Sequence, residues 1–121
     1  MKEFKLLIMG NDGFKNEEIL LKSLCMLQET LLKGLSVSFV NAMLPGADAL
    51  VYMIANQNKV KCYEFNINRR LAGDPVMRVH AKMANFSDGA LIFCEPDDDV
   101  DYMIDYMQRQ SKKVAVVHYS T

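Results

Sequence analysis

Three short segments combine glycine with acidic or amide side chains, the residue types that can hold a small polar ligand. They are Gly10–Phe14, Asn41–Asp48 and Glu95–Asp99, and each follows a short apolar run. Glycine lets a ligand approach the backbone closely, as Gly10 and Gly46 would, and Ala47 keeps the adjoining helix start unobstructed. The side chains of Asn11, Asp12, Asp48 and Glu95 could accept hydrogen bonds from ribose hydroxyls or base amines. We therefore expect these segments to contribute to one binding site.

Each segment also has a plain structural interpretation. Gly10–Phe14 could be an ordinary tight turn between a strand and a helix, because it matches neither GxGxxG nor a Walker loop. Asp48 could stabilise the positive end of a helix, and Asp98 or Asp99 could cap the last helix. The consecutive aspartates lack further ligands to converge with, so we predict no metal site and no cofactor.

A group of basic residues precedes and enters the predicted third helix. It consists of Arg69, Arg70, Arg78 and Lys82. Arg78 and Lys82 are four residues apart and share a helix face, and a guanidinium group can bind a phosphate bidentately. The alternative is a solvated surface, but we predict that Arg78 contacts a phosphate. His80 and His118 show no obvious partners in the sequence, and no Cys–His pair can be inferred from it.

Apolar runs and helical stripes alternate along the chain. Strands are predicted at 4–9, 37–40, 60–65, 90–94 and 113–118. A first helix is expected from Asn16 until Gly34 ends it, and three more are expected at 47–55, 75–86 and 100–107. This alternation predicts a Rossmann-like α/β fold, a three-layer sandwich with a five-stranded parallel sheet and helices on both faces. In such a sheet, ligands bind beyond the carboxyl ends of the strands, where helix N-termini gather.

Length and composition limit the classes of function. The 121 residues predict a single domain spanning 1–121, and 50% hydrophobic residues suffice for one core. A net charge of −1 argues against a general nucleic-acid binder. The sequence shows no secretory signal and no apolar stretch near the roughly 20 residues that span a bilayer. Cys25, Cys62 and Cys94 are expected to be buried reduced thiols, so the predicted location is the cytoplasm, with no membrane partner.

The order of these motifs resembles the SLOG superfamily, and more narrowly its short stand-alone bacterial and phage domains. The similar segments cover most of the chain and are Ile8–Phe14, Asn41–Leu50, Ala72–Pro75 with Arg78, Met83 and Asp88, and Met103–Asp105. The resemblance implies a Rossmann-like domain that senses or sequesters a nucleotide or nucleotide-derived molecule. A homo-oligomer is the expected state.

This chain departs from the superfamily in its glycine loops. Asn41-Ala42-Met43 stands where Ser-Gly-Gly is usual, and the Pro-Gly-Gly-x-Gly-Thr-x-x-Glu motif of the phosphoribohydrolase branch is absent. We therefore expect a non-catalytic binding protein. One alternative is an N-glycosidic hydrolase of nucleotides that uses Asp12, Asp48 or Glu95. Another is a protein-interaction module with a degenerate ligand site.

Overall fold

The computed structural model describes residues 2–10, 14, 16–30, 32–42, 47–65, 73, 75–95 and 100–119. Strands and helices alternate strictly through these residues. The elements are β1 (Glu3–Gly10), α1 (Glu17–Glu29), β2 (Ser36–Asn41), α2 (Ala47–Gln57), β3 (Cys62–Glu64), α3 (Pro75–Phe86), β4 (Gly89–Cys94), α4 (Asp101–Arg109) and β5 (Lys113–His118).

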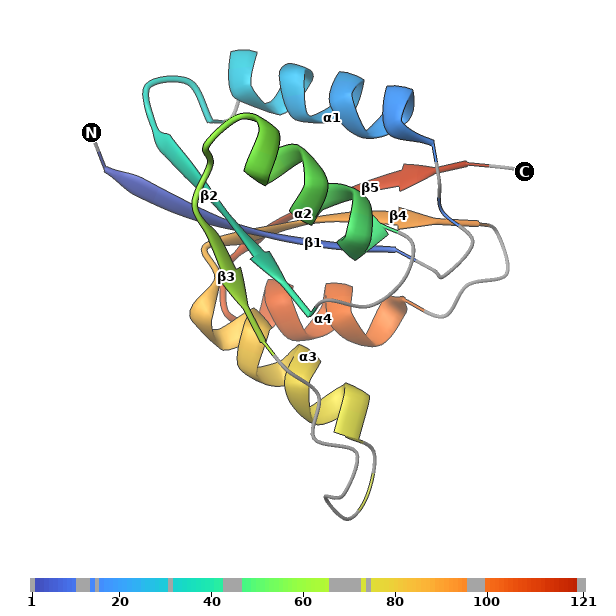
Figure 1. Ribbon diagram of the computed structural model, residues 1–121. Helices are drawn as coiled ribbons and strands as arrows, with labels where there is room; N and C mark the ends of the chain where they lie inside the picture. The colour runs from blue at the N-terminus through green and yellow to red at the C-terminus, as the bar shows by residue number, and fades with distance from the viewer. Residues whose placement is uncertain are drawn as a thin grey trace.

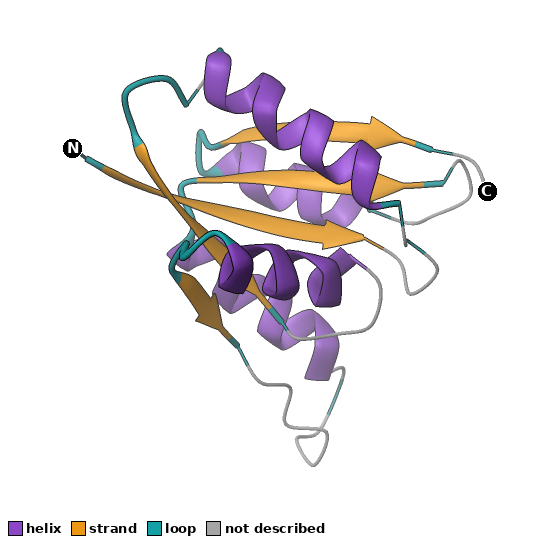
Figure 2. Cartoon of the chain, turned by 45° about the horizontal axis from the view of Figure 1, so that its top comes forward, coloured by secondary structure: helices purple, strands orange, loops and turns teal. Residues whose placement is uncertain are grey.

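The strands form one parallel sheet with the order β3-β2-β1-β4-β5. Helices α1 and α2 cover one face of this sheet, and α3 and α4 cover the other (Figure 1). The predicted Rossmann-like α/β fold with three layers is therefore confirmed. Because all strands are parallel, their carboxyl ends face the same edge of the sheet, and the arrows in Figure 2 show this common direction. We call this the carboxyl edge.

The apolar runs of the sequence form the central strands because both faces of these strands are covered. Along β1, Leu6 and Ile8 belong to the core beneath α1 and α2, whereas Leu7 and Met9 belong to the core above α3 and α4. Each of these four side chains is at most 8% exposed. Every residue of β4 is buried as well. A parallel strand between two helical layers needs a continuous apolar run rather than an alternating one.

The first helix begins where the sequence predicts, but it ends earlier. The side chain of Asn16 accepts a hydrogen bond from the Ile19 backbone N–H at 3.0 Å, as expected of an N-cap. The prediction that the helix continues to Gly34 is wrong, because α1 ends at Glu29. The hydroxyl of Thr30 there donates to the Met26 carbonyl at 2.7 Å. Gly34 instead has a φ of +81° in the turn before β2.

Two smaller expectations are also corrected. The cap predicted at Asp98 or Asp99 is wrong, because the N-cap of α4 is Val100, which packs against the core of that layer. The third strand is shorter than 60–65, since β3 lies at the edge of the sheet and pairs only with residues 39–41 of β2. Cys94 is buried as predicted and Cys62 is partly buried, but Cys25 is exposed, because it lies beside the apolar face of α1 rather than on it.

Candidate functional site

The direction in which the chain crosses the sheet reverses between β1 and β4. After β1 the chain builds β2 and β3 on one side, and after β3 it returns to place β4 and β5 on the other. The connections that leave β1 and β4 therefore lead to helices on opposite faces, α1 and α4 (Figure 1). In open α/β sheets, a reversal of this kind is the place where ligands bind beyond the carboxyl ends of the strands.

Two of the predicted site residues lie on either side of this reversal. Gly10 is the last residue of β1 and pairs with Phe93, and Glu95 directly follows Cys94, the last residue of β4. Both are partly buried. They belong to separate segments of the sequence, and the sheet register places Gly10 beside the end of β4 that precedes Glu95. Asn11, Asp12 and Gly46 lie outside the described residues, so their predicted ligand contacts remain predictions.

The other predicted residues belong to helices that begin at the carboxyl edge. Ala47 and Asp48 are the first two residues of α2, as expected. Arg78 is exposed on α3, and a Cβ atom on Gly73 would lie 3.5 Å from its Nη2 atom. The guanidinium group of Arg78 thus lies beside Gly73, two residues before the start of α3.

The charges at the helix starts distinguish α3 from its neighbours. The first turn of α1 carries Glu17 and Glu18, and that of α4 carries Asp101. The first turn of α3 has no acidic residue. Because acidic side chains in the first turn weaken the attraction of a helix N-terminus for anions, the first turn of α3 is more favourable to an anion than the first turns of α1 and α4.

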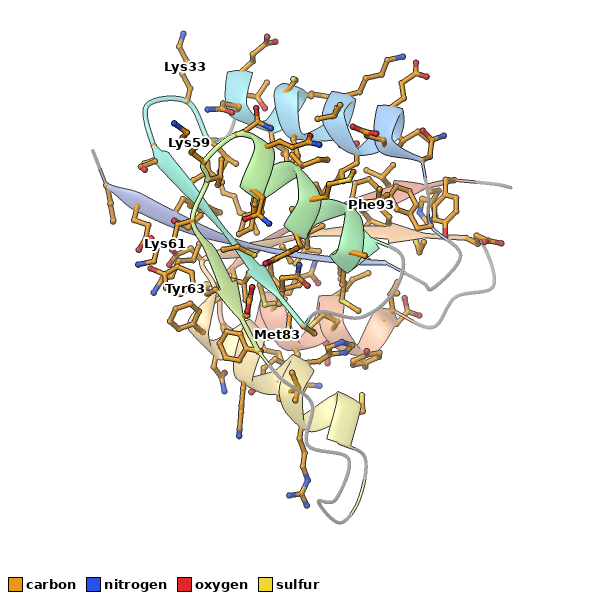
Figure 3. All side chains as sticks on the ribbon, viewed as in Figure 1. Lys33, Lys59, Lys61, Tyr63, Met83 and Phe93 are labelled. Atoms are coloured by element: carbon orange, nitrogen blue, oxygen red, sulfur yellow. The ribbon has the colours of Figure 1, made fainter. Side chains whose placement is uncertain are left out.

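An aromatic cluster fills the α1 side of the carboxyl edge. The ring of Phe14 stacks on Phe93 with centroids 4.5 Å apart and meets the edge of Tyr119 at 4.9 Å. Phe14 and Phe93 are at most 1% exposed, and Figure 3 shows Phe93 between β4 and α1. The sequence grouped Phe14 with the ligand loop, but the side chain belongs to the core. Phe14 therefore contributes to the packing between β4 and α1.

A second arrangement lies between α3 and α4, where the sequence indicated Tyr102 and Tyr106 as candidates for stacking on a base but no partner for His80. His80 Nδ1 and the Tyr102 hydroxyl are 2.9 Å apart, and the two rings are nearly parallel at 15°. Both residues line a slot of about 250 Å³ between the two helices. The signal in the sequence is the spacing of Tyr102 and Tyr106, which are four residues apart and therefore share one face of α4. This face adjoins the buried stripe of Met103 and Met107, so the tyrosines indicate a second contact face on the helix.

A cysteine and a histidine also meet at the carboxyl edge. Cys94 pairs with His118 across β4 and β5, and Cys94 Sγ lies 3.5 Å from His118 Nδ1. A thiol beside an imidazole is the arrangement found in cysteine nucleophiles. Cys94 is only 2% exposed, however, and reactive thiols are accessible to their substrates. We therefore assign this pair a role in packing at the ends of the two strands.

The described residues show no further chemical centre of the kinds considered in the sequence. They contain no group of three His, Cys, Asp or Glu side chains placed to hold a metal ion. Among the same residues, no helix combines the length and apolar character needed to cross a membrane. Comparisons of the chain with family models, curated proteins and solved structures find no match.

Proposed function

We propose that this chain binds a nucleotide or nucleotide-derived small molecule at the carboxyl edge and senses or sequesters it without catalysis. The observation that carries the proposal is the reversal of strand order between β1 and β4, with Gly10 beside Phe93 and Glu95 immediately beyond. A glycine at this point lets a ligand approach the strand end, and the partly buried Glu95 offers an acceptor for ribose hydroxyls. Membership of the SLOG superfamily is part of the same proposal.

The phosphate is assigned to the start of α3. Arg78 supplies an exposed guanidinium group there, and the first helical turn has no carboxylate to repel an anion. A guanidinium–phosphate contact combines charge with two directed hydrogen bonds. The carboxylates at the starts of α1 and α4 make those positions less suitable.

Isothermal titration against nucleoside monophosphates, cyclic dinucleotides and ADP-ribose tests the proposal. We expect at least one member to bind, and we expect Arg78→Ala to weaken its affinity about tenfold, which corresponds to about 1.4 kcal/mol. Arg109→Ala is the matched control. Arg109 is exposed in the last turn of α4 and pairs with Asp105 at 2.9 Å, so its loss should leave binding unchanged. The absence of binding heat from every member would contradict the proposal.

Chromatography of the same mixtures separates binding from hydrolysis of an N-glycosidic bond. We expect the nucleotide to be recovered intact after prolonged incubation. Release of free base that Glu95→Gln abolishes would show an enzyme and would overturn the non-catalytic part of the proposal.

A further inference from the structure

The slot between α3 and α4 has one small side chain, Ala81, and two tyrosines in its lining. Its lining consists of Met77, His80 and Ala81 from α3 and Tyr102, Met103 and Tyr106 from α4. Tyr102 and Tyr106 are one helical turn apart, and the methyl group of Ala81 does not fill the space beside them. A large residue at position 81 would close the slot.

The floor of the slot is buried and its rim is exposed. Met103 is 1% exposed, whereas Met77 is 42% exposed and Tyr106 is 36% exposed. Large apolar side chains at a surface opening form a contact surface that water solvates poorly. A ligand that enters this slot therefore meets apolar surface on its floor and on its sides.

Hydrogen bonds with residues of α3 hold both tyrosines in place. The hydroxyl of Tyr102 bonds His80, which is 6% exposed, and the hydroxyl of Tyr106 donates to Asn85 Oδ1 at 3.0 Å. The orientations of the two phenol rings are thus fixed by groups on the facing helix. A site whose walls are already ordered loses little side-chain entropy when a ligand binds.

The lining also limits the chemistry of the occupant. None of the described residues that line the slot is Lys, Arg, Asp or Glu, so this lining offers no full charge to a charged ligand group. A volume of about 250 Å³ is below the roughly 300 Å³ at which pockets for whole drug-sized ligands begin. Aromatic faces and a methionine sulfur favour a flat, neutral ring, and every nucleobase presents such a π-face.

The slot lies beside the first turns of α3 and α4, the ends of these helices that are at the carboxyl edge. Helix α3 begins at Pro75 and α4 at Asp101, so Met77 and Tyr102 lie in the first turns of their helices. Arg78, the residue assigned to the phosphate, directly follows Met77. We infer that the slot binds the base of the ligand, an inference that rests on the proposed nucleotide-binding function.

Separate probes for the base and the phosphate test the inference. Adenosine carries only the base and sugar, and ribose 5-phosphate carries only the sugar and phosphate. Titration calorimetry and saturation-transfer NMR of both probes are compared in Ala81→Leu, which fills the slot. The control is Gln108→Leu, which adds the same side chain at an exposed position of α4 outside the slot. Circular dichroism and the melting temperature verify that each variant folds.

We expect Ala81→Leu to weaken adenosine binding at least tenfold and to leave ribose 5-phosphate binding unchanged. Gln108→Leu should change neither. Should Ala81→Leu fail to fold, Met77→Ala removes part of the rim at an exposed position and is expected to weaken adenosine binding several-fold. Tyrosine fluorescence gives a second measurement, because the chain has five tyrosines and no tryptophan.

Two results would overturn the inference and leave the proposed function standing. One is equal adenosine affinity in Ala81→Leu and Gln108→Leu while nucleotides still bind. The other is loss of self-association in Ala81→Leu, measured by light scattering, without any loss of adenosine binding, which would make the slot a protein contact. If wild-type protein binds neither nucleosides nor nucleotides, the proposed function itself fails, and the inference fails with it.

Discussion

Hydrogen bonds join different elements on the α3/α4 side of the sheet, whereas the described side-chain hydrogen bonds of α1 and α2 remain local. On the α3/α4 side, His80 bonds Tyr102, and Lys112 Nζ reaches across from the turn before β5 to the carbonyls of Ala84 and Asn85 at 2.6 and 3.0 Å. On the α1/α2 side, Thr30 and Asn58 each donate to a carbonyl four residues earlier in the same helix.

The cavities of the two layers also differ, both in volume and in the kind of contact that bounds them. A groove of about 290 Å³ separates α1 from α2, and a hollow of about 360 Å³ lies beneath the end of α1, bordered by Leu27 and Leu32. Apolar contacts are non-directional and do not fix the distance between two helices. The slot between α3 and α4 is smaller, and polar contacts hold its walls. We infer from this comparison that the slot of the α3/α4 layer has a fixed shape, whereas the packing of the α1/α2 layer is more adaptable.

The largest expected difference between the layers is their response to loss of a large core side chain. Met83 is fully buried between α3 and the sheet, and Figure 3 shows it beneath the strands. Met83→Ala should lower the free energy of unfolding by about 3–4 kcal/mol. Leu27→Ala should lower it by about 2 kcal/mol, because Leu27 already borders a hollow and is 7% exposed. Urea denaturation followed by circular dichroism measures both, and equal losses would contradict the difference in packing.

The second-largest predicted loss of stability concerns Lys112, which links the end of α3 to the turn before β5. Its ammonium group satisfies two carbonyls that the helix cannot satisfy, and burial lowers the pKa of this group. Lys112→Met retains most of the apolar stem and should reduce the free energy of unfolding by about 1–2 kcal/mol. Lys33→Met is the control in the other layer, at an exposed position after α1 (Figure 3), and should change stability by less than about 0.5 kcal/mol. A similar loss in both variants would indicate a general charge effect.

Much of the fold follows from local patterns in the sequence. The buried runs along β1 and β4, the cap at Asn16 and the bounds of β5 were predicted because each depends on neighbouring residues. Helix ends were less predictable. The end of α1 depends on a bond from Thr30 to a carbonyl, which competes with the stop signal at Gly34.

The candidate site was only partly predictable, because it depends on contacts between distant residues. Gly10 and Phe93 are neighbours only because β1 lies beside β4, and periodicity does not determine the order of strands. His80 and Tyr102 are 22 residues apart on separate helices and meet only when both helices pack on the same face. The predicted contacts of Asn11, Asp12 and Gly46 lie outside the described residues.

The smallest predicted effect concerns a polar contact on the α3/α4 side of the sheet, at the start of β1. Glu3 Oε2 accepts hydrogen bonds from the Ser38 hydroxyl at 2.6 Å and the Tyr63 hydroxyl at 2.9 Å. These bonds, first that from Ser38 and then that from Tyr63, hold the pKa of the Glu3 carboxyl below its usual value of 4.5. Figure 3 shows Tyr63 beside Lys61, whose ammonium group lies 4.5 Å from the center of the Tyr63 ring.

The pH dependence of stability follows from the direction of this shift. Because the folded chain has the lower pKa, the unfolded chain binds the proton more readily as the pH falls below about 4.5. The contribution of Glu3 is therefore complete above that pH and is lost as the pH falls through the lower pKa of the folded state. Glu3→Gln should flatten the melting temperature profile between about pH 6 and pH 3. Glu18→Gln, which removes an exposed ion pair with Lys22 on α1, is the control. If the melting temperature of Glu3→Gln falls with pH as steeply as that of the wild type, other carboxylates cause the loss of stability in acid. The ionised Glu3 carboxyl and its two hydrogen bonds then do not contribute to the stability of this layer.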